Sequence, residues 1–106
     1  KAELKMMNLQ FEDYEDFLRR YEQDIDLRSS VYSTAVFFEG IGALVKRKLI
    51  SMDLVDDLIS TDIIRAWEKL KPYAEGLRKK RGRPQHYEWF EYLYNEMKKR
   101  EQKLQQ

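Results

Sequence analysis

Hydrophobic residues recur at alternating steps of three and four along almost the whole of this chain, a spacing typical of amphipathic α-helices. The first row of hydrophobic residues consists of Phe11, Tyr14, Leu18, Tyr21 and Ile25. This row predicts a first helix over about residues 9–25. A second row consists of Val31, Ala35, Phe38, Gly42, Val45 and Leu49, with Phe37, Ile41 and Leu44 beside it. This second helix is apolar on most sides, so we expect it in the middle of a bundle.

Local signals divide the second half of the chain into three further helices. Ser51 is a typical N-cap for a short third helix, and Ser60 or Thr61 for a fourth. Pro72 falls inside the fourth helix, where it removes a backbone hydrogen bond and is expected to introduce a kink.

Glycine and proline mark the remaining boundary. Gly82 fits the left-handed position that ends a helix, and Pro84 fits the first turn of the next. Gly40 and Gly42 are expected to allow close approach of a neighbouring helix. The sequence thus predicts an all-α fold, a compact antiparallel bundle of four longer helices plus one short helix, with the fourth helix kinked at Pro72.

Length and composition favour one domain over residues 1–106, with 1–8 as a flexible N-terminal segment. The chain has 106 residues, of which 42% are hydrophobic, enough for a core without covalent cross-links. It has no cysteine, which excludes disulfides and thiolate metal sites. The longest apolar stretch is too short and too interrupted for a membrane span. We therefore expect a soluble, cytoplasmic protein, and the start at Lys1 leaves an upstream membrane anchor open.

Three blocks of sequence carry a resemblance to a known family. They are FFEGIGALVKR at 37–47, IRAWEKLKPY at 64–73 and YEWFEYL at 87–93. In order and spacing they resemble an uncharacterised prokaryotic family of helical proteins, the DUF4760 domain of unknown function. The resemblance covers most of the chain from about the second helix onward and implies a compact α-helical module. It implies no reaction, ligand or catalytic residue.

Glu39 is the only charged residue between Arg28 and Lys46, on the helix expected to be most buried. A buried carboxylate needs an ion pair or hydrogen bonds, or else its pKa rises. We expect a buried polar site in which Glu39 forms an ion pair or hydrogen bond; its candidate partners are Arg65, Arg78, Tyr73 and Trp67. The alternative is a small-ligand or enzymatic domain centred on Glu39.

No residue pattern indicates catalysis or cofactor binding. The sole histidine, His86, has no partners at the spacing of a catalytic triad or a metal site. We assign no catalytic, metal or cofactor-binding residue, expect no cofactor, and expect the protein not to be an enzyme.

Charge is segregated although the formal net charge is only +1. Residues 11–26 are rich in acids, whereas a basic patch lies at the end of the fourth helix: Arg78, Lys79, Lys80, Arg81 and Arg83. Within it, Arg81-Gly82-Arg83-Pro84 resembles the core of the AT-hook, whose arginines lie in the narrow minor groove of A·T-rich DNA. A nucleic-acid-binding domain that uses the loop 78–86 is therefore an alternative. The short connection between two helices argues against it.

The fifth helix has more large apolar residues than one buried face holds. Its main row consists of Tyr87, Phe90, Tyr94 and Met97. Trp89, Tyr92 and Leu93 spread around much of the remaining circumference, and aromatic residues are enriched at interface centres. The sequence therefore favours a non-enzymatic protein–protein interaction module, with a protein partner or a homo-oligomer formed through this surface.

Overall fold

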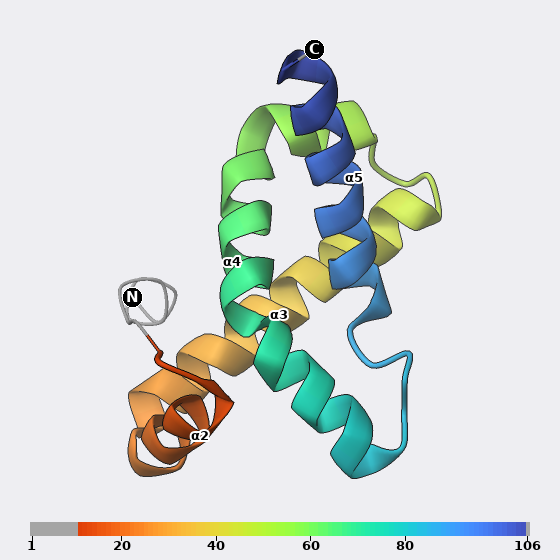
Figure 1. Ribbon diagram of the computed structural model, residues 1–106. Coiled ribbons are helices and arrows are strands. Elements are labelled where there is room, and N and C mark those ends of the chain that lie inside the picture. The colour runs from red at the N-terminus through yellow and green to blue at the C-terminus, as the bar shows by residue number, and fades with distance from the viewer. Residues whose placement is uncertain (1–10, 106) are drawn as a thin grey trace.

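The computed structural model describes residues 11–105, and this part of the chain forms four helices (Figure 1). They are α2 (Tyr14–Gln23), α3 (Ile25–Lys46), α4 (Met52–Arg81) and α5 (Glu88–Gln105). Residues 11–105 contain no strand, so the predicted all-α fold is confirmed. The segment 1–8, expected to be flexible, lies outside the described residues.

The helix α3 is the element on which the other three described helices pack. Figure 1 shows α3 running obliquely across the molecule, with α2, α4 and α5 on its near side. The contact between α3 and α5 is more extensive than that between α3 and α4, although α4 follows α3 directly in the chain. The predicted antiparallel arrangement describes α4 and α5, which run side by side in opposite directions, while α3 crosses both.

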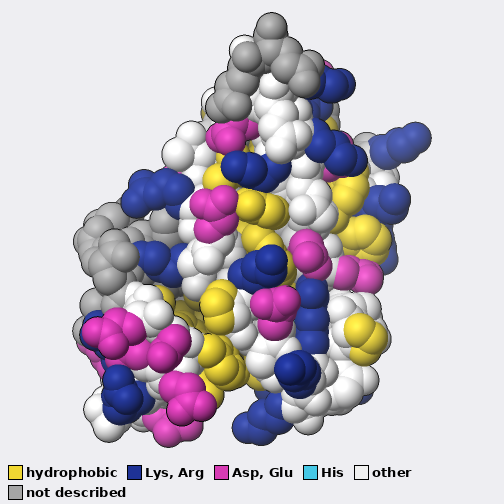
Figure 2. Space-filling model, in the orientation of Figure 1, with side chains coloured by type: hydrophobic (Ala, Val, Ile, Leu, Met, Phe, Trp, Pro, Cys, Tyr) yellow, Lys and Arg dark blue, Asp and Glu magenta, His cyan; other side chains and the backbone are white. Residues whose placement is uncertain are grey.

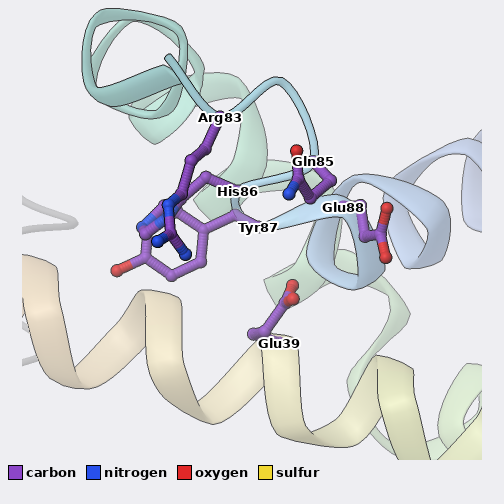
Figure 3. A pocket seen from close by; sticks show the side chains of 6 residues that line it. All are labelled: Glu39, Arg83, Gln85, His86, Tyr87 and Glu88. Carbon is purple, nitrogen blue, oxygen red and sulfur yellow. The ribbon is translucent and has the colours of Figure 1, made fainter. Parts of the chain in front are cut away.

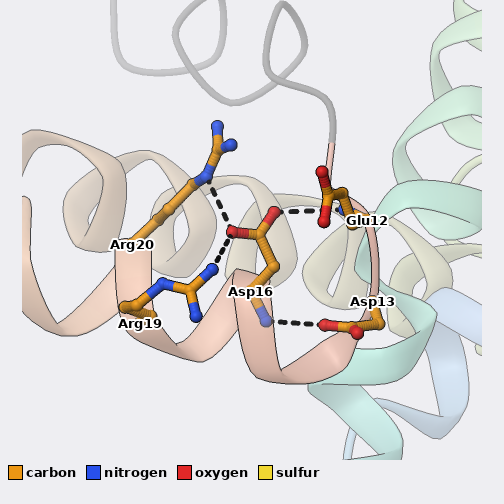
Figure 4. Close-up of polar contacts among 5 residues, drawn as sticks. All are labelled: Glu12, Asp13, Asp16, Arg19 and Arg20. Carbon is orange, nitrogen blue, oxygen red and sulfur yellow. Dashed lines mark hydrogen bonds and ion pairs between the residues drawn. The ribbon is translucent and has the colours of Figure 1, made fainter.

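Two aspartates define the start of α2, which lies later than the predicted residue 9 (Figure 4). The Asp13 carboxylate accepts a hydrogen bond from the Asp16 N–H at 2.8 Å and is the N-cap. The Asp16 carboxylate accepts from the Glu12 N–H at 3.1 Å and from the side chains of Arg19 at 2.7 Å and Arg20 at 3.2 Å. The Glu12 N–H above all, and then the two arginines, lower the pKa of Asp16 although burial opposes them.

The predicted third and fourth helices are joined in α4. The Ser51 hydroxyl accepts from the Leu54 N–H at 3.0 Å, which confirms Ser51 as N-cap. The predicted division between a short third helix and a fourth corresponds to a kink at Ile59, where φ is −142° and ψ is 21°, directly before the predicted cap at Ser60 or Thr61; the two helical segments meet there without a connecting loop. The short segment before Ile59 and the longer segment after it together make up α4.

Pro72 lies inside α4, on its exposed side. The dihedral break in α4 is at Ile59, and the backbone around Pro72 stays helical. Figure 1 shows α4 changing direction in this part, where its colour passes from green to teal. The bend is thus spread over continuous helical turns, as expected where proline removes one hydrogen bond but its neighbours remain.

The connection from α4 to α5 is only partly as predicted. Gly82 has φ 61° and ψ 33°, which confirms the left-handed end of α4. Pro84 does not begin the next helix, because α5 begins at Glu88. Tyr87, just before it, also has φ 61°, a value that favours glycine. The Tyr87 ring is buried, with its centroid 6.4 Å from the centroid of the Tyr73 ring, and this packing favours the left-handed backbone conformation of Tyr87.

The core lies where α3, α4 and α5 meet. Trp67 on α4 is buried, and its ring meets Phe90 on α5 edge to face at 5.0 Å. Phe38 on α3 contacts the same Phe90 ring at 5.2 Å. These three aromatic residues join the three helices and fix the position of α5 on α3.

Candidate functional site

Glu39 on α3 caps the N-terminus of α5. Its Oε1 accepts a hydrogen bond of 2.8 Å from the backbone N–H of Phe90. The backbone N–H of Trp89 also stabilises the charged form of the Glu39 carboxylate. Figure 3 shows the side chain rising from α3 toward the beginning of α5. The first N–H groups of a helix have no partner within the helix, so an acceptor is needed there. Glu39 supplies it from another helix.

The environment of Glu39 disfavours its charge. The side chain is half-buried, and burial raises the pKa of the carboxyl above its ordinary value. The N–H groups of Phe90 and Trp89 oppose this rise, Glu88 adds to it, and Arg78 opposes it more weakly. The net direction is upward, so desolvation outweighs the favourable end of the helix dipole.

Gly42, one turn after Glu39, allows the beginning of α5 to pack directly against α3. A Cβ at position 42 would lie 2.7 Å from the Trp89 carbonyl carbon. No side chain larger than hydrogen fits there without moving α5. The predicted close approach at Gly42 is confirmed, and the group that approaches is the Trp89 backbone.

The predicted trio of Glu39, Arg65 and Arg78 is not brought together as an ion-pair site. Arg65 is exposed on α4 and has no part in the pKa shift of Glu39. Arg78 donates from Nε to the His86 carbonyl at 2.8 Å and from a terminal nitrogen to Glu91 at 3.0 Å. Its guanidinium also lies over the Trp67 ring, 5.8 Å from the centroid. Arg78 therefore joins α4 to the loop and α5.

A shallow, open pocket of about 330 Å³ lies between Glu39 and the loop before α5 (Figure 3). Its lining residues are Glu39, Arg83, Gln85, His86, Tyr87 and Glu88. Burial first, and then the neighbouring arginines, lower the pKa of His86, which favours the neutral imidazole. Within residues 11–105 no group of three or more histidine, aspartate or glutamate residues is placed to hold a metal ion. The Glu39 carboxylate that lines this pocket also accepts the hydrogen bond from the Phe90 N–H of α5.

The basic patch is mostly exposed, with one member engaged in the fold. Lys79, Lys80, Arg81 and Arg83 are exposed, whereas Arg78 is only 17% exposed in its side chain. The loop after α4 is folded in turns, with the Arg83 N–H bonded to the Arg78 carbonyl at 3.0 Å. The segment that resembles an AT-hook is therefore a compact helix connection. The acidic side chains gather elsewhere, over α2 (Figure 2).

The apolar surface predicted on α5 is largely covered. Leu93 is 0% exposed and belongs to the core, so its assignment to an exposed interface is wrong. Trp89 and Tyr92 are half-buried, with their rings edge to face at 6.0 Å. The Lys46 ammonium lies 5.9 Å from the Trp89 ring and 5.6 Å from the Tyr92 ring, a cation–π arrangement that covers both.

An exposed apolar surface lies on α3, the helix that the sequence predicts in the middle of the bundle. Its exposed residues follow at helical spacing along one side of the helix. They are Ile25, Ser29, Tyr32, Ser33, Val36, Phe37, Gly40 and Leu44, called here the outer face. Tyr32 is 60% exposed and Phe37 55%. Between Asp26 and Lys46, every exposed residue of α3 is uncharged.

The sequence pattern of α3 is compatible with two arrangements of this helix. A helix that is apolar on most sides is buried all round or has one buried and one exposed apolar face. In the structure Leu27, Val31, Phe38 and Val45 form the buried side, and the outer face lies opposite. None of the helices in the described part has the length and apolar character needed to cross a membrane.

Comparison with known proteins identifies a family and no function. The family model described as a domain of unknown function, DUF4760, matches residues 2–97. No curated protein and no solved structure matches the chain.

Proposed function

The chain belongs to the DUF4760 family, and we propose that it is a non-enzymatic protein–protein interaction module whose contact surface is the outer face of α3. The observation that carries this proposal is the run of exposed, uncharged residues along α3 between Asp26 and Lys46. Contiguous exposed apolar patches on folded proteins commonly mark contact sites.

The composition of the outer face fits this role. Tyr32 and Phe37 are large amphipathic or apolar residues of the kind enriched at interface centres. Ser29, Ser33 and Gly40 lie on the same exposed side of α3 and are small, so another backbone can approach α3 closely. In the isolated domain Tyr32 and Phe37 leave more than half of their surface in water, so burying them on a partner is favourable.

The α5 surface supports the proposal less well. Lys46 lies over both Trp89 and Tyr92, and Leu93 is inside the core. A partner at that position would first have to displace Lys46. We therefore place the contact surface on α3.

Site-specific photo-crosslinking tests the proposal without knowledge of the partner. A benzophenone amino acid is placed at Tyr32 or Phe37, and at the exposed α4 positions Lys71 and Glu75 as controls. Irradiation in cells of the source organism should give a discrete adduct from positions 32 and 37 and none from 71 and 75. Adducts from all four positions alike, or from none, would contradict the proposal.

A further inference from the structure

Resting on the proposed function, we propose that the partner is a second copy of this chain, with the two α3 helices packed antiparallel through their outer faces. A two-fold axis passes near Val36. Self-association of this kind is the commonest oligomeric arrangement of soluble proteins, and it requires a face that is complementary to itself.

Gly40 is the first observation behind this inference. Glycine in the interior of a helix is destabilising compared with alanine. Gly42 has a reason in the fold, because a Cβ there would collide with the Trp89 backbone. Among residues 11–105, a Cβ built at Gly40 meets nothing within 4 Å. The packing of the part of the chain that the structure describes thus gives no reason for a glycine at position 40, whereas close approach of a second helix does.

The position of Gly40 sets the register. Tyr32 and Gly40 are both exposed and lie four residues on either side of Val36. In an antiparallel pair with Val36 on the two-fold axis, Tyr32 of each copy lies opposite Gly40 of the other. The open space over Gly40 then receives the Tyr32 ring, which is 60% exposed in the single chain.

Charge at the two ends of α3 favours the same orientation. The exposed Asp26 lies near the N-terminal end, whereas Lys46, Arg47 and Lys48 form an exposed basic group at the other end. Asp26 and Lys46 are each ten residues from Val36. Antiparallel packing brings the acidic end of one copy to the basic end of the other, and parallel packing would bring like charges together.

The area available fits a weak, reversible dimer. From ordinary side-chain areas, the exposed parts of the five large apolar residues of the outer face sum to roughly 500 Å² per copy, and a standard interface buries about 800 Å² per partner. These residues are Ile25, Tyr32, Val36, Phe37 and Leu44. The backbone around Gly40 and the two serines adds to this area. We expect a dimer that forms at micromolar to millimolar protein concentration.

Thiol crosslinking tests the register directly, because the chain has no cysteine and each variant carries a single thiol. A short bis-maleimide should join two copies of Val36→Cys rapidly. In the antiparallel pair the two thiols of Asp26→Cys are about 30 Å apart at 1.5 Å of rise per residue, so that variant should not crosslink. Lys71→Cys, on the exposed side of α4, measures collisional crosslinking. Crosslinking of Val36→Cys no faster than Lys71→Cys, or equal crosslinking of Asp26→Cys, overturns the inference.

Gly40→Ala separates the role of this glycine in the dimer from its role in the helix. In dilute solution the variant should melt a few degrees higher than wild type, because alanine favours the helix. Sedimentation equilibrium should show its dimer dissociation constant raised by at least about tenfold, as expected when a central contact is blocked. An unchanged dissociation constant would overturn the inference.

If the domain is monomeric but benzophenone at Tyr32 captures a different protein, this inference fails and the proposed function stands; if it captures nothing, both fail.

Discussion

The Phe90 N–H donates a 2.8 Å hydrogen bond to the carboxylate of Glu39, a residue fifty-one positions earlier in the chain. Tyr87, which precedes α5, has no carboxylate, amide or aliphatic hydroxyl of the kind that usually caps a helix. The cap therefore comes from α3, and the same contact fixes how α5 lies on α3. Gly42 makes the contact sterically possible by admitting the Trp89 backbone.

Replacement of Glu39 should show a capping role. Glu39→Ala leaves the Phe90 N–H without its acceptor and should lower the free energy of unfolding by about 1–2 kcal/mol. Glu39→Gln retains an acceptor oxygen and should cost less. Chemical denaturation of both variants at neutral pH measures the difference, and equal losses would show that the oxygen is not what matters.

The pH dependence of the same pair of proteins gives an independent check. The pKa of Glu39 is raised by folding, so the carboxylate form costs stability that the protonated form does not. As pH rises from the unfolded-state pKa of about 4.3 through the higher folded-state pKa, wild type should lose stability relative to Glu39→Gln. Denaturation at a series of pH values measures this, and a relative gain of wild type over that window would contradict the raised pKa.

Arg78 should not tolerate lysine. Its guanidinium bonds the His86 carbonyl and Glu91 from different nitrogens and lies over Trp67, which one ammonium group cannot reproduce. Arg78→Lys should lower the free energy of unfolding by about 1–2 kcal/mol. The matched control is Arg65→Lys, at an exposed arginine of the same helix, which should change it by less than about 0.5 kcal/mol. Equal effects of the two substitutions would mean that the contacts of Arg78 contribute nothing specific.

Thr34 offers a stabilising substitution. Its side chain is buried on α3, and among the described residues its hydroxyl has no hydrogen-bond partner. Valine has nearly the same shape and a similar helix propensity, so Thr34→Val should raise the free energy of unfolding by about 1 kcal/mol. Thr61→Val, at an exposed position of α4, is the control and should be close to neutral. A loss of stability in Thr34→Val would reveal an acceptor for the hydroxyl.

Helix content could be predicted from this sequence because it depends on local periodicity. The signals at Ser51 and Gly82 were also sufficient, since each acts on its own helix end. The start of α5 could not be predicted in the same way. Pro84 suits a first turn, but the left-handed Tyr87 and the cap from Glu39 move the start to Glu88, and both depend on tertiary packing.

The candidate site was harder to predict for a related reason. Periodicity shows that α3 is apolar on more than one side, yet only the placement of the other helices shows which side remains exposed. On α5, Leu93 was assigned to the surface although it is fully buried. Trp89 and Tyr92 lie under Lys46, a contact between helices that spacing along one helix does not reveal.

The basic patch should bind DNA only weakly and without sequence preference. Arg81 and Arg83 flank the left-handed Gly82 in a compact connection, which does not extend into a minor groove. Fluorescence anisotropy with A·T-rich and G·C-rich duplexes should give similar, steeply salt-dependent binding that is negligible at physiological salt. Sub-micromolar binding with A·T preference, lost in the double variant Arg81→Ala/Arg83→Ala, would instead assign the domain to nucleic-acid recognition.

Sedimentation equilibrium of the wild-type chain beside a variant with a polar outer face tests the role of α3 most directly. The variant carries Tyr32→Ser, Val36→Ser and Phe37→Ser, all at exposed positions, so its helical circular dichroism should match wild type. We predict that wild type passes from monomer to dimer between micromolar and millimolar concentration, while the folded variant stays monomeric. A wild type that remains monomeric throughout, or a variant that dimerises equally well, would contradict self-association through this face of α3.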